Sequence, residues 1–238
     1  MSENKEKILI IDFGSQFTQL IARRVREFGV YSEIVPFNNI IKEDAIENLS
    51  GIIFSGGPHS VIHEGSPQAP NWLFELGKPI LGICYGQQTI VNQLGGKVIN
   101  SGKREYGNSS LLITQQSPLF KGVWEKDQNY TVWMSHGDSV SQLPEEFDVI
   151  AKTDNAPFAA ISCDEKKYYG LQFHPEVFHT VNGNLIIKNF LDICSISFNW
   201  TMASFFEVQK RIITEQVKND RVICGLSGGV DSSVVAVL

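Results

Sequence analysis

The sequence is poor in residues that would indicate a metal site, a disulfide scaffold or a nucleic-acid surface. It has only four cysteines, Cys84, Cys163, Cys194 and Cys224, and the nearest two are 30 positions apart. Because no pair has the spacing of a zinc or redox motif, these thiols favour a reducing, cytoplasmic setting. Lysine and arginine (20) are outnumbered by aspartate and glutamate (26), which argues against binding along a nucleic-acid backbone.

Long apolar runs, low-complexity tracts and internal repeats are also missing. No segment approaches the ~20 apolar residues of a membrane span. The residues before Lys7 are polar and lack the apolar core of a signal peptide. With 238 residues, 42% of them hydrophobic, the chain is long enough for one well-buried domain and a fragment of another. We therefore expect no membrane and no nucleic-acid partner.

The first part of the chain alternates short apolar segments with helical patterns. A helix is expected at Gln16–Phe28, where apolar residues have helical spacing, and another at Tyr85–Leu94. The segments expected as strands are Lys7–Asp12, Tyr31–Val35, Gly51–Ser55 and Pro79–Ile83. This alternation predicts an α/β fold with a mostly parallel sheet covered by helices on both faces.

The middle of the chain is richer in strands than in helices. Polar turns separate strand-like segments, which predicts antiparallel strands added to the parallel core; these segments are Ser110–Thr114, Tyr130–Met134, Ala159–Cys163 and Tyr168–Phe173. A helix at Asn184–Cys194 closes a first domain, predicted at residues 1–196. Residues 197–238 then hold a connecting helix (Trp200–Lys218) and a strand (Arg221–Gly225), predicted as the start of a truncated second α/β domain.

A glycine-flanked cysteine marks the point where a predicted strand gives way to a helix. Gly82-Ile83-Cys84-Tyr85-Gly86 is the cysteine form of the G-x-S-x-G nucleophile elbow. The sharp turn needs small neighbours and a strained nucleophile backbone. The adjoining helix N-terminus favours the thiolate of Cys84 over the thiol. Taken alone, the pattern also fits a buried structural cysteine between turn glycines.

A histidine and a carboxylate follow the last predicted strand of the first domain. His174 and Glu176 are two residues apart, so in extended chain they point to the same side. Pro175 keeps His174 out of the helical conformation. A carboxylate so placed would fix the imidazole tautomer and stabilise the imidazolium. His136 is a second candidate base by residue type, and His174 is preferred on the expectation that only it has a carboxylate two residues further on.

The third element is Ser55-Gly56-Gly57-Pro58, which directly follows a predicted strand. Its glycines let the backbone approach a ligand closely, and Pro58 has no N–H to donate. An oxyanion donor from this loop therefore comes from Gly57 or Gly56, and the N–H of Tyr85 is the natural second donor. An ordinary tight turn would have the same composition.

Together these three elements resemble the class I, triad-type glutamine amidotransferases over residues 7–195. The resemblance implies Cys84 as nucleophile, His174 as general base and then acid, and Glu176 as the orienting carboxylate. It implies Gly57 and Tyr85 as the oxyanion hole, and neither metal nor cofactor for glutamine hydrolysis. The segment Trp133–Asp138 (WMSHGD) also matches the family. Implied contacts to the substrate glutamine are Gln88, Ser135 and His136.

A second glycine-rich loop lies near the end of the sequence. Ser227-Gly228-Gly229-Val230-Asp231-Ser232-Ser233 lacks the lysine and the glycine spacing of a Walker A loop. It resembles the S-G-G-x-D-S loop of N-type ATP pyrophosphatases. That likeness implies ATP binding by Ser227, Gly228, Gly229, Val230, Asp231, Ser232 and Ser233, with Asp231 either near a magnesium-bound phosphate or capping the helix.

An amidotransferase joined to this loop resembles the GMP synthetase family, as do the segments Ile11–Gln16 and Gly102–Gly107. The resemblance implies a reaction in which ATP and Mg²⁺ adenylate XMP and ammonia from glutamine then aminates it to GMP. It also implies a homodimer formed through a region beyond this sequence. Only five residues follow Ser233, so we expect this chain to hydrolyse glutamine but not to make GMP unaided.

Two other functions stay open. One is the glutaminase component of another pathway, such as anthranilate or carbamoyl phosphate synthesis, against which the Ser227–Ser233 loop argues. The other is a non-catalytic regulatory or assembly module, against which intact Cys84, His174 and Glu176 argue.

Overall fold

The computed structural model describes residues 6–237, without the side chains of Ser101, Lys103, Ser204 and Phe205. The first five residues and Leu238, which the predicted domain ranges include, lie outside this described part. The chain divides into two compact units, Met1–Asn199 and Trp200–Leu238, and each is described by itself. The domain boundary at residues 196–197 stays a prediction.

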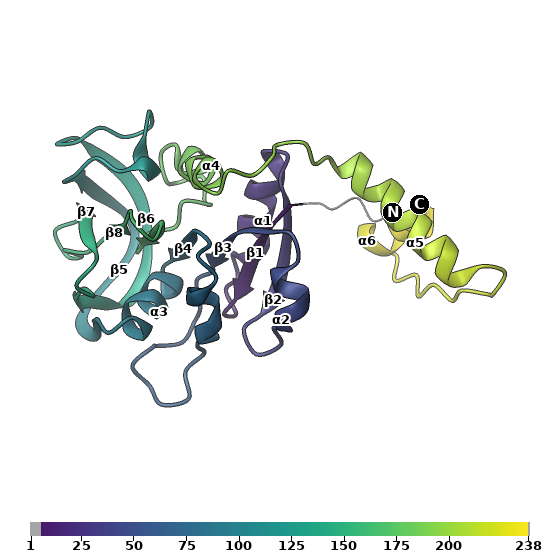
Figure 1. Ribbon diagram of the computed structural model, residues 1–238, viewed down its shortest axis with the longest axis horizontal. Coiled ribbons are helices and arrows are strands. Elements are labelled where there is room, and N and C mark those ends of the chain that lie inside the picture. Colours follow the sequence, from purple (N-terminus) through teal and green to yellow (C-terminus); the bar gives the residue numbers. More distant parts are fainter. Residues whose placement is uncertain (1–5, 238) are drawn as a thin grey trace. The chain divides into compact units, whose positions relative to one another are not determined.

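One mixed sheet organises the first unit, with the strand order β2-β1-β3-β4-β9-β8-β7-β5-β6 (Figure 1). The strands on its parallel side are β1 (Lys7–Asp12), β2 (Tyr31–Pro36), β3 (Leu49–Phe54), β4 (Ile80–Ile83) and β9 (Tyr168–Leu171). The antiparallel strands are β5 (Lys97–Ile113), β6 (Asn129–Gln142), β7 (Asp148–Lys152) and β8 (Ala160–Cys163). Because β9 takes the fifth place, the parallel half has the 2-1-3-4-5 order of flavodoxin-like folds. The predicted class of this unit is confirmed.

Helices cover both faces of the parallel strands. On one face lie α1 (Thr18–Glu27) and α4 (Gly183–Ile193), and on the other lie α2 (Lys42–Ile46) and α3 (Tyr85–Gln93), together with the 3₁₀ turn η1 (Asn71–Glu75). Strand β1 shows why helices are needed on both faces of the sheet. Its residues are buried on both sides, with Ile8 and Ile10 in one core and Leu9 and Ile11 in the other.

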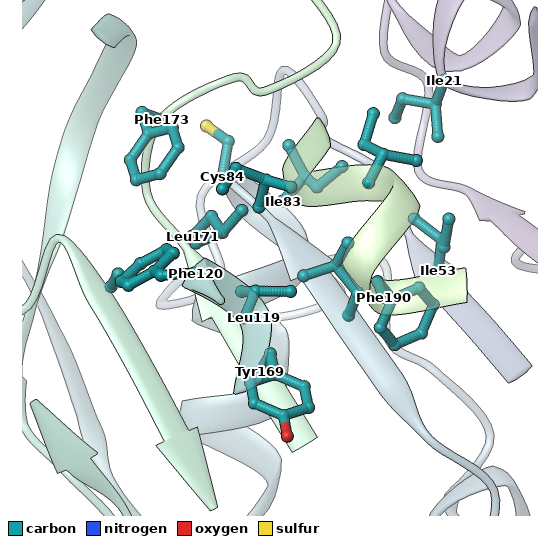
Figure 2. Packing of buried hydrophobic residues seen from close by; sticks show 14 of the residues in the cluster. Ile21, Ile53, Ile83, Cys84, Leu119, Phe120, Tyr169, Leu171, Phe173 and Phe190 are labelled. Atoms are coloured by element: carbon teal, nitrogen blue, oxygen red, sulfur yellow. The ribbon is translucent and has the colours of Figure 1, made fainter. Parts of the chain in front are cut away.

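The core under α1 and α4 extends up to the predicted nucleophile. Figure 2 shows Cys84 and Phe173 at one margin of this cluster, with Leu171 and Ile83 below them. Leu119 and Phe120, from the 3₁₀ turn η2 (Pro118–Phe120), pack into the same cluster. The residues around Cys84 are therefore held by a dry, closely packed core.

The antiparallel half is longer than predicted. Strands β5 and β6 extend well beyond the expected Ser110–Thr114 and Tyr130–Met134, and β7 was not expected at all. Many of the additional residues are polar, and cross-strand pairing rather than apolar alternation holds them in the ladder. The pairing shifts register between Asn100 and Glu105 of β5, which marks a bulge.

The second unit contains α5 (Met202–Val217) and α6 (Val230–Val237). The strand predicted at Arg221–Gly225 is wrong, because these residues have no strand pairing and are exposed, with Ile223 97% accessible. A strand needs a neighbour for its backbone N–H and C=O groups, and no residue described in this unit provides one. None of the helices within residues 6–237 has the length and apolar character required to cross a bilayer.

Candidate active site

Cys84 occupies the sharp turn between β4 and α3. Its backbone is left-handed, with φ 53° and ψ −106°, a conformation that residues with a side chain rarely adopt. A Cβ on Gly82 would lie 2.6 Å from the Gly86 carbonyl oxygen, and one on Gly86 would lie 2.3 Å from the Phe54 carbonyl oxygen. Only glycine fits at both positions, as the elbow motif predicts.

Parallel pairing of β4 with β9 brings Cys84 and His174 to the same edge of the sheet. Ile83 pairs with Leu171, and the N–H of Cys84 donates to the Leu171 carbonyl at 2.6 Å. The carboxyl ends of neighbouring parallel strands meet at one edge, so the residues that follow β4 and β9 lie side by side. This edge is where ligands bind in open α/β sheets.

His174 and Glu176 form a buried pair. Nδ1 of His174 lies 2.7 Å from Oε1 of Glu176, and the two residues are 3% and 1% exposed. The ring of Phe17 packs edge-on against the imidazole, with 5.3 Å between ring centres. The backbone of Gly56 faces the other side, since a Cβ there would lie 3.3 Å from Cε1 of His174. The imidazole is thus fixed from several sides.

Opposing effects act on the pKa of His174. Burial disfavours the charged ring and lowers the pKa, but the Glu176 carboxylate and the neighbouring Cys84 sulfur outweigh this effect. The result is a His174 pKa well above the usual 6.5. The raised pKa favours the protonated ring, and a protonated ring beside Cys84 can stabilise a thiolate.

The two predicted oxyanion donors lie next to each other. A Cβ on Gly57 would lie 2.9 Å from the Phe13 carbonyl oxygen and 3.2 Å from Cγ of Tyr85, so this position admits only glycine. Tyr85 is the first residue of α3, where N–H groups have no partner within the helix. Its hydroxyl donates to the Pro67 carbonyl at 2.6 Å, and burial raises the pKa of Tyr85 to about 12.

A pocket of about 700 Å³ opens over the nucleophile. The thiol of Cys84 reaches its wall and donates to the Ser135 carbonyl at 3.5 Å. Six of the eight residues predicted for glutamine hydrolysis line this pocket: Gly57, Cys84, Tyr85, Gln88, Ser135 and His136. His174 and Glu176 are buried outside this wall. The volume lies within the range of small-molecule sites, roughly 300–1,000 Å³.

Gln88 lies in the pocket wall but its amide group is already engaged. Nε2 donates to the Asp138 carbonyl at 2.9 Å and to Oε1 of Gln172 at 3.1 Å. The predicted contact of Gln88 with a substrate stays a prediction, and the structure adds that Gln88 ties α3 to β6.

The criterion that favoured His174 over His136 does not separate them, since Asp138 also lies two residues after His136. The geometry does. The Glu176 carboxylate contacts His174, whereas only the backbone carbonyl of Asp138 contacts His136, through Nδ1 at 3.0 Å. The other ring nitrogen of His136 faces Glu105 at 3.1 Å. Both nitrogens of His136 are therefore engaged with groups other than Cys84, whereas His174 is hydrogen-bonded to Cys84.

Three polar residues of the site were not predicted. Gln172 places Nε2 at 3.7 Å from the Cys84 sulfur, and its signal was the alternation of Gln172, His174 and Glu176 along one side of the chain. Thr180 accepts from the Trp133 N–H at 3.0 Å and donates to the His174 carbonyl at 2.7 Å. Glu105 contacts His136 across the sheet. For these last two no pattern in the sequence predicts the partner.

The serine-rich loop precedes α6 in the second unit. Gly228 has φ +82°, the hydroxyls of Ser227 and Ser232 lie 3.0 Å apart, and Ser233 donates to the Gly229 carbonyl at 2.8 Å. Val230 and Asp231 begin the helix. The seven residues implied in ATP binding thus form a short loop and the first residues of α6, and their role stays a prediction.

The sequence model of the family described as "Glutamine amidotransferase class-I" matches residues 9–194, more than three quarters of the chain. The chain belongs to the class I glutamine amidotransferase family. The match spans Cys84, His174 and Glu176, together with the whole nine-stranded sheet apart from the first residues of β1. The family resemblance seen in the sequence is confirmed, as is the fold of this amidotransferase unit.

Relatives of this amidotransferase place it more narrowly. It is 55% identical to the glutamine-hydrolysing GMP synthase of Zymomonas mobilis over 98% of this chain and 45% of that protein. The corresponding enzyme of Bartonella henselae is 53% identical over 99% of this chain and 46% of its own length. The chain thus spans about half the length of the curated relatives it matches.

A solved structure gives the same answer for the fold. A Thermoplasma acidophilum protein described as one of the subunits of a GMP synthase superposes with a TM-score of 0.71 and 32% identity. The match covers 87% of this chain and 98% of that protein. A glutamine amidotransferase from Thermotoga maritima, at 20% identity and a TM-score of 0.60, shares the fold.

Proposed function

We propose that this chain hydrolyses glutamine to glutamate and ammonia at Cys84. The observation that carries the proposal is the buried group in which Glu176 contacts His174 at 2.7 Å while the left-handed turn of Cys84 stands beside it. A histidine oriented by a carboxylate next to an activated thiol has the arrangement of a cysteine-dependent acyl transfer site.

The reaction follows from these groups. The Cys84 thiolate attacks the side-chain amide carbon of glutamine, and the N–H groups of Gly57 and Tyr85 hold the resulting oxyanion. The protonated His174 gives its proton to the leaving nitrogen, so ammonia departs and a thioester remains. His174, now neutral, takes a proton from water, which attacks the thioester to release glutamate and the thiolate.

We further propose that the ammonia aminates adenylated XMP to GMP in a longer protein that binds ATP and Mg²⁺. Support comes from the relatives named GMP synthase, at 53–55% identity, and from the Ser227–Ser233 loop. Within that loop, backbone N–H groups and serine hydroxyls would bind phosphate oxygens, and Asp231 would stand near the metal. Dimerisation of the longer protein and a cytoplasmic setting belong to the same proposal.

Glutamate release from glutamine by this chain tests the hydrolysis. The matched variants are Cys84→Ala and Cys163→Ala, since both thiols are buried but only Cys84 lies in the site. An electrophilic glutamine analogue followed by mass mapping identifies the modified residue. We expect turnover and labelling to vanish only in Cys84→Ala. Well-folded chain in which the analogue leaves Cys84 unmodified would refute the assignment.

The amination is tested in a fusion to the remaining half of the Zymomonas mobilis relative. We expect GMP formation from XMP with either glutamine or ammonium as nitrogen source. Cys84→Ala should abolish the glutamine-dependent reaction and leave the ammonium-dependent one. Loss of both the glutamine-dependent and the ammonium-dependent reaction in a folded Cys84→Ala fusion would contradict the proposal that Cys84 serves only to release ammonia.

A further inference from the structure

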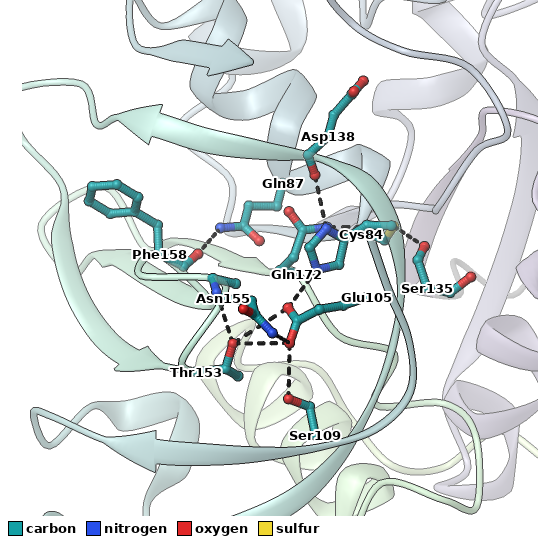
Figure 3. Close-up of polar contacts among 12 residues, drawn as sticks. Cys84, Gln87, Glu105, Ser109, Ser135, Asp138, Thr153, Asn155, Phe158 and Gln172 are labelled. Carbon is teal, nitrogen blue, oxygen red and sulfur yellow. Dashed lines mark hydrogen bonds and ion pairs between the residues drawn. The ribbon is translucent and has the colours of Figure 1, made fainter. Parts of the chain in front are cut away.

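Glu105 and His136 form a second buried pair, between strands β5 and β6. The two residues are direct neighbours across the β5–β6 ladder, and they are 8% and 5% exposed. Oε2 of Glu105 lies 3.1 Å from Nε2 of His136. Figure 3 shows the Glu105 carboxylate at the centre of a group of polar side chains from several strands and loops. A buried charge needs such partners to be stable.

Hydrogen-bond complementarity fixes the protonation of this pair. Nδ1 of His136 lies 3.0 Å from the Asp138 carbonyl, which only accepts, so Nδ1 donates. The Glu105 carboxylate is surrounded by further donors: Ser109 Oγ at 3.1 Å, Asn155 Nδ2 at 3.4 Å and Thr153 Oγ1 at 3.4 Å. These donors favour the ionised carboxylate.

Thr153 strengthens this assignment. Its Oγ1 already accepts the N–H of Ala156 at 2.9 Å, so its own proton is free to point at Glu105. An ionised Glu105 accepts at Oε2 as well, and Nε2 of His136 must then also donate. With an ionised Glu105 both partners of His136 are acceptors, and this geometry fits a ring that donates from both nitrogens.

His136 contacts a backbone carbonyl of a residue that lines the pocket. The Asp138 oxygen accepts from His136 and also from Gln88 Nε2 at 2.9 Å. Gln88 in turn contacts Gln172, whose amide reaches the Cys84 sulfur. The contacts therefore run without a break from Glu105 to the nucleophile, and the segment of residues 135–138 is held between them.

We propose that Glu105 is a positioning residue that keeps His136 doubly protonated and so holds the wall of residues 135–138 in shape for glutamine. This inference rests on the proposed hydrolysis, because it assigns the wall to that substrate. It also accounts for two histidines in one site with separate tasks. His174 exchanges protons with the reactants, and His136 keeps both of its protons.

Nitrogen NMR of histidine-labelled chain tests the protonation directly and needs no turnover. His136→Gln assigns the signals, and the exposed His59 and His63 serve as internal references. At pH 7 we expect both ring nitrogens of His136 to carry a bonded proton in the wild type. In Glu105→Gln we expect one of them to lose it. A singly protonated His136 in the wild type, or an unchanged His136 in Glu105→Gln, would overturn the proposal.

Two labelling reagents then separate positioning from a general structural role. The rate of labelling by iodoacetamide depends on the reactivity of the Cys84 thiol. The rate of labelling by a glutamine-derived chloroketone also depends on how well the reagent fits the wall of residues 135–138. In a Cys224→Ser background, which removes the exposed thiol, we expect Glu105→Gln to slow chloroketone labelling about tenfold. Iodoacetamide labelling should stay within about twofold. Glu33→Gln is the matched control, because it removes the Lys7–Glu33 ion pair (2.8 Å) at the other edge of the sheet.

The outcomes are distinct. Equal slowing with both reagents would indicate a merely structural role and overturn the proposal, as would unchanged chloroketone labelling in Glu105→Gln. If neither reagent labels folded wild-type chain, the proposed hydrolysis fails. The NMR measurement still decides the state of His136 in that case.

Discussion

The Glu176 carboxylate contacts His174 through one oxygen only: Oε1 lies 2.7 Å from Nδ1, while Oε2 is buried and has no hydrogen-bond partner among the described residues. No other hydrogen-bond donor among the described residues therefore stabilises the negative charge of this carboxylate. In a buried environment it acts on the imidazole with little screening by water. Glu176 accordingly controls the protonation of the ring.

We predict that Glu176→Gln lowers the pKa of His174. The variant keeps the size of the side chain but removes the charge that holds the pKa above 6.5. The pKa should fall because the uncharged amide no longer favours the imidazolium, while burial of the ring still disfavours it. Titration of the ring Cε1–H signal by NMR measures it. An unchanged pKa would mean that the Cys84 sulfur, rather than Glu176, stabilises the charged ring.

The same pair makes stability depend on pH. Because the folded pKa of His174 is raised, its stabilising contribution is fully present below pH ~6.5 and is lost as the pH rises through the folded pKa. We expect the free energy of unfolding of the wild type to exceed that of Glu176→Gln most just below pH ~6.5. The difference should shrink as the pH rises through the folded pKa of His174. Urea unfolding at several pH values measures this, and a difference that grows with pH would contradict it.

Gln172→Leu should make Cys84 less reactive. The substitution removes the amide that lies 3.7 Å from the sulfur, donates to it, and would also stabilise its thiolate form. A hydrogen bond to a charged group contributes ~1.5 kcal/mol, so we expect about tenfold slower alkylation by iodoacetamide at pH 7. Gln87→Leu is the control, since that buried amide donates to the Phe158 carbonyl instead. Equal slowing in both variants would argue against a specific effect of Gln172.

Gly86→Ala should destabilise the fold strongly. The new methyl group would lie 2.3 Å from the Phe54 carbonyl oxygen, so α3 and β3 must separate. We expect a loss of about 3 kcal/mol in urea unfolding. Gly225→Ala, where no atom lies within 4 Å of the added carbon, should stay within ~0.5 kcal/mol. A similar small effect at Gly86 would mean that the elbow tolerates rearrangement.

Thr180→Val should weaken the contact between β6 and the segment that carries His174. The hydroxyl accepts from the Trp133 N–H and donates to the His174 carbonyl, and valine leaves both groups buried without a partner. The expected loss is ~1–3 kcal/mol in unfolding free energy. Thr180→Ser keeps the hydroxyl and should recover most of it. If serine behaves like valine, the methyl group rather than the hydroxyl carries the effect.

The sequence predicted those features that depend on neighbours in the chain. The elbow at Cys84 and the oxyanion glycine at Gly57 were accessible because a tight turn or a close approach demands a glycine at a defined offset. The contact of His174 with Glu176 was expected from their spacing of two residues in extended chain. The contact is present, but the extended conformation is not, because β9 ends at Leu171 and the chain turns at Pro175 and Glu176. Each of these signals lies within a few residues.

Features that depend on pairing between distant segments were not predictable. Nothing local places Glu105 opposite His136, since that neighbourhood comes from the register of β5 and β6 and from the bulge after Asn100. The pairing of β4 with β9, which brings Cys84 to His174, is likewise a property of the whole sheet. The apolar segment Arg221–Gly225 shows the converse, because a strand pattern without a pairing partner does not form a strand.

At Cys84, the residue that would be best for stability differs from the residue that the chemistry needs, because the backbone there has a positive φ. Holding a residue with a side chain in such a conformation costs about 1–3 kcal/mol. Glycine would adopt this conformation without strain, so selection for stability alone would favour glycine over cysteine at this position. A cysteine is therefore expected there only where the thiol is needed for function. The sheet and helices around it must then offset the strain through their own packing.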